Sequence, residues 1–417
     1  MSTDERSARY TGTVATKPFG KDPAPGESIR PSVSSSSLRP IAFGQADAAR
    51  DAPRRGADGI KDDLARQLTL MANRAASYRK LVPLLVQLLD DAQQGPVLLS
   101  SMQRAWKSRE FGAFYERPLL LFAALRADAL ADGPSHPLHA ALRDDAPDPD
   151  AMTEAALREA VSPAQTGLWT SLGLRRVQTN ETSRALAWLW PAALAGCSGG
   201  ARPVVLVDVG CSAGLNLVGD HLPRPWTAGG APLAVAERPR VIGRFGLDER
   251  PLDVARAEDA RWLRACVWPG ETQRLERLDA ALAALQSARA RGERIEVVRR
   301  HATGAAAYAR GALASAPPRT LTIVYQTMMS GYLDPASRAA FEDGLHQLVV
   351  TSPRGAVVWV DLEVTGPATS PRPAELWVHL RRGDERTDLM LGTTGYHPAD
   401  VSVRRDAVLD LTKILRD

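Results

Sequence analysis

Near residue 200 the hydrophobic pattern of the chain changes its period, and this change constrains the fold more than any other feature. Before it, apolar residues recur every three or four positions, as at Ile60, Leu64, Leu68 and Met71, which predicts amphipathic helices. After it come short β-branched runs such as Val204–Val207, which are typical of strands buried on both faces. We therefore expect a helical first half and a second half built on a sheet.

Strand-like and helix-like segments alternate in the second half. Apolar runs at Ile295–Val298, Leu321–Tyr325 and Ala356–Val360 are separated by helical patterns, which predicts a mostly parallel sheet with crossover helices. Shorter strands are expected at one edge, over Leu376–Leu391 and Val401–Arg404. The predicted fold class is α/β, with a Rossmann-like, mostly parallel sheet of the class I methyltransferase type. An α-helical domain and a disordered tail precede it.

The composition divides the chain into three parts. Residues 1–57 are rich in Ser, Pro, Gly and Arg, which predicts a disordered tail. Residues 58–196 are predicted to form a helical domain that covers the substrate, with Pro83 kinking or restarting a helix. Residues 197–417 are predicted to form the sheet domain, with a Pro- and Gly-rich insertion at 221–240 and a short strand within it at Leu233–Ala236.

Charge and hydropathy argue against several classes of partner. The formal net charge is only +4 over 417 residues, and Lys and Arg alternate with Asp and Glu, so there is no clear nucleic-acid signal. No apolar stretch reaches the ~18 residues that span a bilayer, and the N-terminus lacks the apolar core of a secretory signal. We expect a cytoplasmic protein that acts on a small molecule, and nothing in the sequence indicates its oligomeric state.

The most informative segment runs from Val204 to Asp220. A strand ends at Asp208, a turn contains Gly210 and Gly214, and a helix is expected to open near Ala213. Glycine lets a ligand approach the backbone, and a helix N-terminus attracts an anion. In a methyltransferase this anion is the methionine carboxylate of S-adenosylmethionine, which is the predicted cofactor.

An acidic residue after the second strand is expected to hold the ribose hydroxyls of the cofactor. Asp248 follows a predicted strand at Val241–Leu247, although the insertion places it farther from the glycines than the usual ~20 residues. The predicted cofactor-binding set is Asp208, Gly210, Ser212, Gly214, Asn216 and Asp248.

The same turn permits a second interpretation. Residues 210–214 read Gly-Cys-Ser-Ala-Gly, which fits the nucleophile elbow of a serine hydrolase with Ser212 as nucleophile. Asp361 and either His379 or His397 would then complete the triad. The helical upstream half disfavours this interpretation, because the hydrolase elbow follows several strands. A third alternative is a non-catalytic binding protein on a degenerate methyltransferase fold.

A polar cluster precedes the sheet and could face a substrate. Arg176, Gln178, Asn180 and Arg184 are predicted to bind the acceptor, while a capped helix is the competing explanation. A base is needed when the methyl acceptor carries a proton, and Glu181 of this cluster, with His301 and His397, is the candidate. His136 and His139 lack neighbouring ligands in the sequence, so no metal site is predicted.

Four ordered motifs resemble those of the bacterial family named domain of unknown function 2332. They are RRVQTNE (Arg175–Glu181), VDVGCSAGLNL (Val207–Leu217), GLDERPLDV (Gly246–Val254) and WLRACVWPG (Trp262–Gly270). The resemblance implies a methyltransferase-like core over roughly residues 60 to 400. His301 stands where this family tends to carry an acid, which in methyltransferases contacts adenine. Gln326 follows the fourth strand, where methyltransferases often carry substrate-facing residues.

Overall fold

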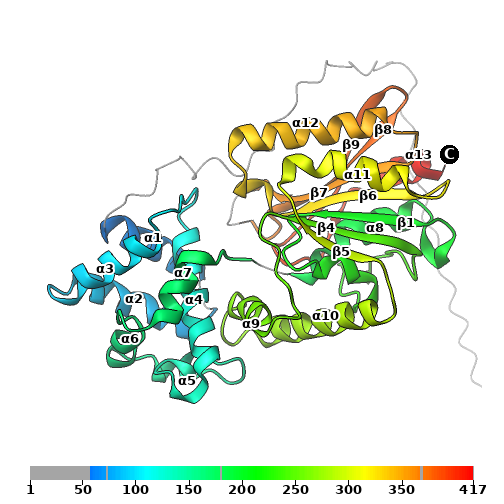
Figure 1. The fold of residues 1–417 in the computed structure, drawn as a ribbon. Coiled ribbons are helices and arrows are strands. Elements are labelled where there is room, and N and C mark those ends of the chain that lie inside the picture. The colour runs from blue at the N-terminus through cyan, green and yellow to red at the C-terminus, as the bar shows by residue number, and fades with distance from the viewer. Residues whose placement is uncertain (1–56, 72–73, 179–180, 367–369, 417) are drawn as a thin grey trace, which may run out of the picture. The chain divides into compact units, whose positions relative to one another are not determined.

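The computed structural model describes residues 57–71, 74–178, 181–366 and 370–416. The predicted tail over residues 1–57 therefore lies outside the described residues, except for Ala57. Along the described chain a helical region comes first and a mixed α/β region follows (Figure 1). This order agrees with the change of hydrophobic period near residue 200.

Within the described residues, eight α-helices precede the first strand. They are α1 (Ala57–Met71), α2 (Ala76–Asp90), α3 (Gln94–Ala105), α4 (Glu116–Asp132), α5 (His139–Leu142), α6 (Glu154–Ala160), α7 (Thr166–Leu174) and α8 (Leu186–Leu194). A helix does not restart at Pro83, because Pro83 lies inside α2, and the kink that is the alternative stays a prediction. Leu81, Val82 and Leu85 on either side of it are buried, and this packing outweighs the one backbone hydrogen bond that proline removes.

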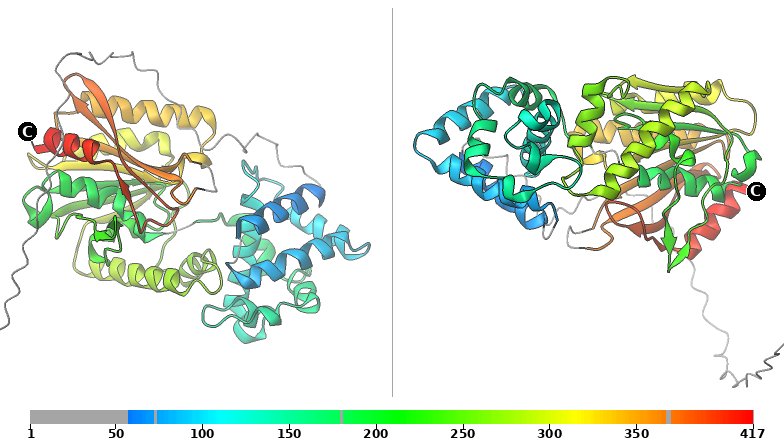
Figure 2. Two further views of the ribbon diagram at one scale, coloured as in Figure 1. Left: turned by 180° about the vertical axis from the view of Figure 1, so that it is seen from behind. Right: turned by 90° about the horizontal axis from the view of Figure 1, so that it is seen from below.

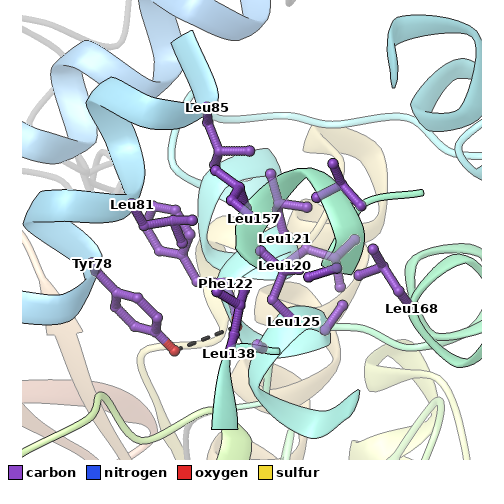
Figure 3. Packing of buried hydrophobic residues seen from close by; sticks show 14 of the residues in the cluster. Tyr78, Leu81, Leu85, Leu120, Leu121, Phe122, Leu125, Leu138, Leu157 and Leu168 are labelled. Atoms are coloured by element: carbon purple, nitrogen blue, oxygen red, sulfur yellow. Dashed lines mark hydrogen bonds between the residues drawn. The ribbon is translucent and has the colours of Figure 1, made fainter. Parts of the chain in front are cut away.

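The helical region has its own apolar core. The rings of Tyr78 on α2 and Phe122 on α4 stack with centroids 4.7 Å apart, and the Tyr78 hydroxyl donates a hydrogen bond to the Phe122 carbonyl at 3.3 Å (Figure 3). Leucines of α2, α4, α6 and α7 fill the space around these rings, including Leu85, Leu157 and Leu168. The predicted three- and four-residue spacing is what brings these side chains to one side of each helix.

The main sheet contains eight strands in the order β10-β9-β8-β7-β6-β1-β4-β5. Their bounds are β1 (Val204–Val209), β4 (Val241–Asp248), β5 (Ile295–Arg299), β6 (Leu321–Thr327), β7 (Val357–Val364), β8 (Ala374–Arg382), β9 (Glu385–Thr394) and β10 (Ser402–Val403). Five neighbouring strands of the sheet, β5, β4, β1, β6 and β7, pair in parallel. The strands β8, β9 and β10 are added to β7 in antiparallel fashion.

Helices cover both faces of the sheet (Figure 2). One face packs against α8 and α13 (Arg405–Arg416), and the other packs against α11 (Ala305–Ala314) and α12 (Pro335–Thr351). Successive β1 residues alternate between the two cores, with Leu206 on the α8 face and Val207 on the α11 face. Both cores need apolar side chains, which explains the uninterrupted apolar run that marked β1 in the sequence.

The structure agrees with the coarse predictions and corrects finer ones. Each predicted apolar run of the second half is a strand of a mixed α/β fold, and the edge strands lie where expected. Within the predicted insertion, however, the short strands are β2 (Thr227–Ala228) and β3 (Ala231–Pro232), so the strand expected at Leu233–Ala236 is wrong. The boundaries at 58–196 and 197–417 stay predictions.

Two negative findings apply to the described part of the chain. None of its helices is long and apolar enough to cross a membrane. Its His, Cys, Asp and Glu side chains form no group of three that could hold a metal ion.

Candidate functional site

The order of the parallel strands reverses at β1. β4 and β5 lie on one side of β1, whereas β6 and β7, which come later in the chain, lie on the other side. In open α/β sheets, ligands bind at the carboxyl ends of the strands where such a reversal occurs. Asp208 of β1 is the register partner of both Gly246 and Tyr325. The predicted residues Asp248 and Gln326 therefore lie at the same edge of the sheet as the glycine turn.

Turns with left-handed backbone conformations follow the two adjacent strands β1 and β6. Gly210 after β1 has φ of 77° and is exposed, and a Cβ at this position would lie 2.9 Å from the Met329 Cβ. Ser212 in the same turn has φ of 54°, and Met328 after β6 has φ of 53°. This left-handed conformation costs a non-glycine residue about 1–2 kcal/mol, and such strain clusters at functional sites.

Asp248 holds the strained turn in place. Its Oδ2 accepts a hydrogen bond from the Ser212 amide at 2.8 Å, and its Oδ1 accepts one from the Arg250 amide, also at 2.8 Å. Burial raises the pKa of Asp248, although the two amides oppose that rise. The acid predicted to bind ribose is thus fixed beside the glycine turn, at the end of the strand adjacent to β1.

The turn is not followed by the α-helix that the sequence predicted. A short 3₁₀ helix, η5 (Leu215–His221), follows instead, and its backbone is kinked at Val218. The amides of Gly210 and Cys211 both donate to the Leu247 carbonyl. The expected helix N-terminus for an anion is therefore wrong, because the segment is too short and these amides are already bound within the protein.

Gln178 lies over the turn. The Ser212 hydroxyl donates a hydrogen bond to the Gln178 Oε1 at 3.2 Å, and the Gln178 Nε2 donates to the Arg250 carbonyl at 3.0 Å. The structure thus brings one predicted substrate residue against two elements of the predicted cofactor site. Gly214, with φ of 76°, packs against Val297, and Asn216 is buried.

Asp208 lies on the face of β1 that packs against α8. It is 2% exposed, and the neighbouring residues of the same face, such as Leu206 and Tyr325, are apolar or aromatic and fully buried. Burial raises the pKa of Asp208 to about 8, with the nearby Tyr325 opposing the rise. With a pKa in this range, the Asp208 carboxyl is mostly neutral near pH 7.

His301 lies beyond the end of β5 and joins a different group of residues. Its Nε2 lies 3.1 Å from the Glu249 Oε1, and its Nδ1 lies 2.9 Å from the Thr303 hydroxyl. Arg176 also contacts Glu249, with 3.5 Å between the charged atoms. His301 and Arg176 therefore both contact Glu249, the residue that follows Asp248.

Glu181 forms the second centre of the site. This carboxylate is 2% exposed and is contacted by a histidine and two arginines: the His397 Nδ1 at 2.9 Å, the Arg277 Nε at 3.2 Å and the Arg274 Nε at 3.4 Å. Burial alone would raise the pKa of Glu181, but His397 and Arg277 hold it below its usual range. Two predicted catalytic residues, Glu181 and His397, are thus brought together from distant parts of the sequence.

Arg184 is attached to the same loop as His397. Its Nε donates a hydrogen bond to the carbonyl of Tyr396 at 3.3 Å, and the whole side chain is almost buried. Burial lowers the pKa of Arg184, with Glu181 and the Tyr332 hydroxyl acting against that change. Arg184 therefore lies within electrostatic range of Glu181, although the carboxylate is contacted by other cations.

A buried polar chain joins the ends of β6 and β7. The Trp359 indole donates to the Gln326 Oε1 at 2.8 Å, and the Gln326 amide lies 3.5 Å from the Ser330 hydroxyl, which donates to the Glu363 Oε1 at 2.9 Å. The Glu363 Oε2 is buried without a hydrogen-bond partner. Burial, followed by the charge of Asp361, raises the pKa of Glu363 to about 7.

Sequence reasoning missed several residues of this edge. Glu363, Arg274 and Arg277 were not predicted, although β7 reads VVWVDLEV and is buried throughout. Acids that interrupt an otherwise apolar strand are a usable signal, because a buried carboxyl needs a partner or a function. Arg274 and Arg277 lie on the helix α10 (Thr272–Ala290) with ordinary helical spacing, and only the fold identifies them.

Five of the predicted site residues thus form two groups. Gln178, Ser212 and Asp248 belong to the first, and Glu181 and His397 to the second. Asn180 lies outside the described residues. A cavity of about 450 Å³ lies elsewhere, between β4 and α11, where Phe245 and Tyr308 are among its lining residues, and none of the predicted site residues lines it.

A family model described as "Uncharacterized protein conserved in bacteria (DUF2332)" matches residues 66–402 of the chain. No curated protein and no solved structure matches it.

Proposed function

The chain belongs to this DUF2332 family of bacterial proteins, and on that premise we propose that it is an S-adenosylmethionine-dependent methyltransferase acting on a small-molecule acceptor. The order of the parallel strands supports a Rossmann-like fold. If the five parallel strands are numbered 1 to 5 in chain order, their order in the sheet, β5-β4-β1-β6-β7, is 3-2-1-4-5, as in the parallel part of doubly wound dinucleotide-binding folds. The antiparallel strands that follow β7 add an edge to this arrangement.

One observation carries the proposal: the hydrogen bond from the Ser212 amide to the Asp248 carboxylate. It joins the glycine turn after the first strand to the acid after the adjacent strand. In doubly wound folds these two positions hold the phosphate or carboxylate end of a nucleotide ligand and its ribose. Gly210, which is exposed and has no side chain, lies at the open side of the same turn.

The residues fit parts of the cofactor to different degrees. Asp248 retains acceptor capacity for ribose hydroxyls, because each carboxylate oxygen has two lone pairs and accepts one backbone amide here. Gly210 leaves room for close approach to the backbone. Glu249 and His301 lie one step farther along the edge and would face the base. The carboxylate end has the poorest fit, because turn amides are bound internally.

The cofactor supplies an activated methyl group on a sulfonium centre, so the chain must mainly align the acceptor and exclude water. His397 is the residue that takes a proton from the acceptor. The Glu181 carboxylate lies 2.9 Å from its Nδ1, which fixes the position of the ring beside a negative charge. Burial lowers the pKa of His397, with Glu181 opposing, so the imidazole is mostly neutral near pH 7 and one ring nitrogen can accept a proton.

The hydrolase alternative is not supported by His379, one of the two histidines proposed for its triad. His379 has its Nε2 2.6 Å from Asp361 and its Nδ1 2.7 Å from Asp388, so both ring nitrogens are bound by carboxylates. A catalytic histidine needs one nitrogen for the serine hydroxyl. A fluorophosphonate probe provides the test: labelling that is lost in Ser212→Ala would favour the hydrolase over the methyltransferase.

Calorimetric titration with S-adenosylhomocysteine tests the proposed function. We expect saturable binding by the wild-type protein and a loss of at least tenfold in affinity for Asp248→Ala. Asp253→Asn is the matched control, because Asp253 is an exposed acid of the same loop and its Oδ1 accepts a single backbone amide. Binding should be unchanged in that variant.

Two results would contradict the proposal. One is the absence of both heat and thermal shift in the folded wild-type protein at millimolar ligand. The other is equal binding by wild-type protein and a folded Asp248→Ala variant. If neither cofactor binding nor Ser212 labelling occurs, the non-catalytic binding protein is the better description.

A further inference from the structure

Arg184 is a buried cation whose charge is not matched by an adjacent acid. The side chain is 8% exposed, and its Nε donates to one backbone carbonyl, that of Tyr396. Among the described residues, no carboxylate oxygen lies within 4.0 Å of its guanidinium, whereas Arg274 and Arg277 each contact one. Arginine cannot lose its proton in a protein, so this charge stays in place.

The nearest acid does not neutralise Arg184. Glu181 is already shared by Arg274, Arg277 and His397. Burial also raises the pKa of Glu363, the other acid within electrostatic range, to about 7, so it carries only part of a charge near neutral pH. The surroundings of Arg184 thus have an excess of positive charge.

The terminal nitrogens of Arg184 are available to a ligand. They make no hydrogen bond with the described chain, and they are not among its fully buried, unpartnered polar atoms, so they retain access to solvent. A planar guanidinium donates two parallel N–H bonds to a carboxylate or a phosphate. Removing a guanidinium from water is unfavourable, and one backbone carbonyl offsets only part of this desolvation.

Two exposed aromatic side chains accompany the guanidinium. Tyr332, on the short 3₁₀ segment after β6, is 57% exposed, and Tyr396 is 40% exposed. Tyr396 carries the carbonyl that Arg184 binds, and the Tyr332 hydroxyl acts electrostatically on Arg184. Aromatic faces beside a cation suit an organic anion whose body is apolar or aromatic.

We infer that Arg184 binds the oxyanion of a small organic acid, a carboxylate or a phosphate, and that this acid is the methyl acceptor. The second half of the inference rests on the proposed function, whereas anion binding by Arg184 does not. His397 follows Tyr396 directly, so the residue that holds the anion and the residue that takes the acceptor's proton are attached to the same loop. The acceptor is therefore anchored next to the proposed base.

The test uses three probes on the full-length protein without cofactor: benzoate, benzamide and inorganic phosphate. Benzamide is the matched control for benzoate, because it keeps the ring and lacks the charge. Ligand-observed NMR and thermal shift should show saturable binding of benzoate or phosphate and none of benzamide. A benzoate response indicates a carboxylic acid, and a response to phosphate alone indicates a phosphate ester.

Two variants show whether Arg184 is responsible. Arg184→Lys keeps the charge and loses the planar fork, and we expect at least a tenfold loss of affinity. Arg310→Gln, at an exposed position on α11, should bind as the wild-type protein does. In case Arg184→Lys does not fold, the ¹⁵Nε signal of Arg184 in the wild-type protein gives a second readout, because it should shift on addition of the anion.

The inference is overturned if neither anion binds the folded wild-type protein at tens of millimolar. It is also overturned if Arg184→Lys retains full affinity, or if anions bind while the Arg184 signal is unchanged. S-adenosylhomocysteine binding is measured separately on the same sample. Cofactor binding without anion binding therefore refutes the anion site alone, and the reverse result refutes the methyltransferase alone.

Discussion

Asp208 and Glu181 are buried to the same extent, each 2% exposed, and yet their pKa values move in opposite directions. Asp208 faces an apolar core, and burial raises its pKa to about 8. Burial also acts to raise the pKa of Glu181, but His397 and Arg277 hold it below the usual range. Burial therefore does not set the charge of a carboxyl by itself, because neighbouring groups that favour the charged form can outweigh it.

The two acids accordingly serve different regions of the sheet edge. A neutral carboxyl at the end of β1 fits a structural support beneath the glycine turn. A permanently charged carboxylate before α8 fits a residue that positions Arg274, Arg277 and His397 around it.

The largest effect is expected for Glu181→Gln. Removing one partner of a buried charge cluster leaves its cations unpaired, which typically costs about 3–5 kcal/mol. Because Arg277 is one-third exposed, we expect the lower end, about 3 kcal/mol of unfolding free energy by urea titration. Glu237→Gln, at a side chain that is 78% exposed, should change stability by less than about 0.5 kcal/mol. A loss under 1 kcal/mol in Glu181→Gln would remove the contrast with Asp208.

The second effect is a change in the pH dependence of stability in Asp208→Asn. A carboxyl with a raised pKa in the folded state makes stability fall as the pH rises towards that pKa, because the unfolded chain releases its proton first. With a pKa of about 8 for Asp208, wild-type stability should fall by about 2 kcal/mol relative to the variant between roughly pH 6 and 8. Urea titrations at both pH values measure the difference. Parallel curves would show that Asp208 is ionised in the folded protein.

A smaller effect is expected for Arg277→Gln. This change removes one of the cations that lower the pKa of Glu181, so acid unfolding should begin at a higher pH. The sign follows because a depressed carboxyl pKa gives stability that is lost as the pH falls through it. The loss at neutral pH should stay below about 1 kcal/mol, as for other partly exposed pairs. Arg310→Gln is the control, and an unchanged acid transition in Arg277→Gln would contradict the assignment.

The smallest effect concerns the strained turn above Asp208. Because Ser212 has a φ of 54°, Ser212→Gly should be more stable than Ser212→Ala by about 0.5 kcal/mol: glycine accepts the left-handed conformation, but it loses more backbone entropy on folding. Both variants lose the hydroxyl bond to Gln178, so their difference isolates the backbone strain. Ser315, with φ of −89°, gives the matched pair in which alanine should be the more stable residue. The same order at both positions would argue against strain at Ser212.

The alternation of strands and helices in the second half of the chain was predictable from its amino-acid sequence. Apolar runs such as Val204–Val207 pack against helices on both faces, so their composition alone predicted buried strands. The positions of Gly210 and Asp248 at strand ends followed in the same way, because a turn residue and a polar residue end an apolar run. The helix expected at Ala213 was wrong because local pattern does not record how the turn amides bind to Leu247 and Asp248.

The contacts between polar residues, in contrast, depend on the tertiary structure. Glu181 and His397 are separated by more than half of the chain, and Arg274 lies on a helix whose spacing marks it only as a solvated residue. Their contacts depend on strand order and crossover connections, which carry no local signature. The opposite charge states of Asp208 and Glu181 have the same origin, because a pKa depends on the cations that the fold brings within a few ångströms.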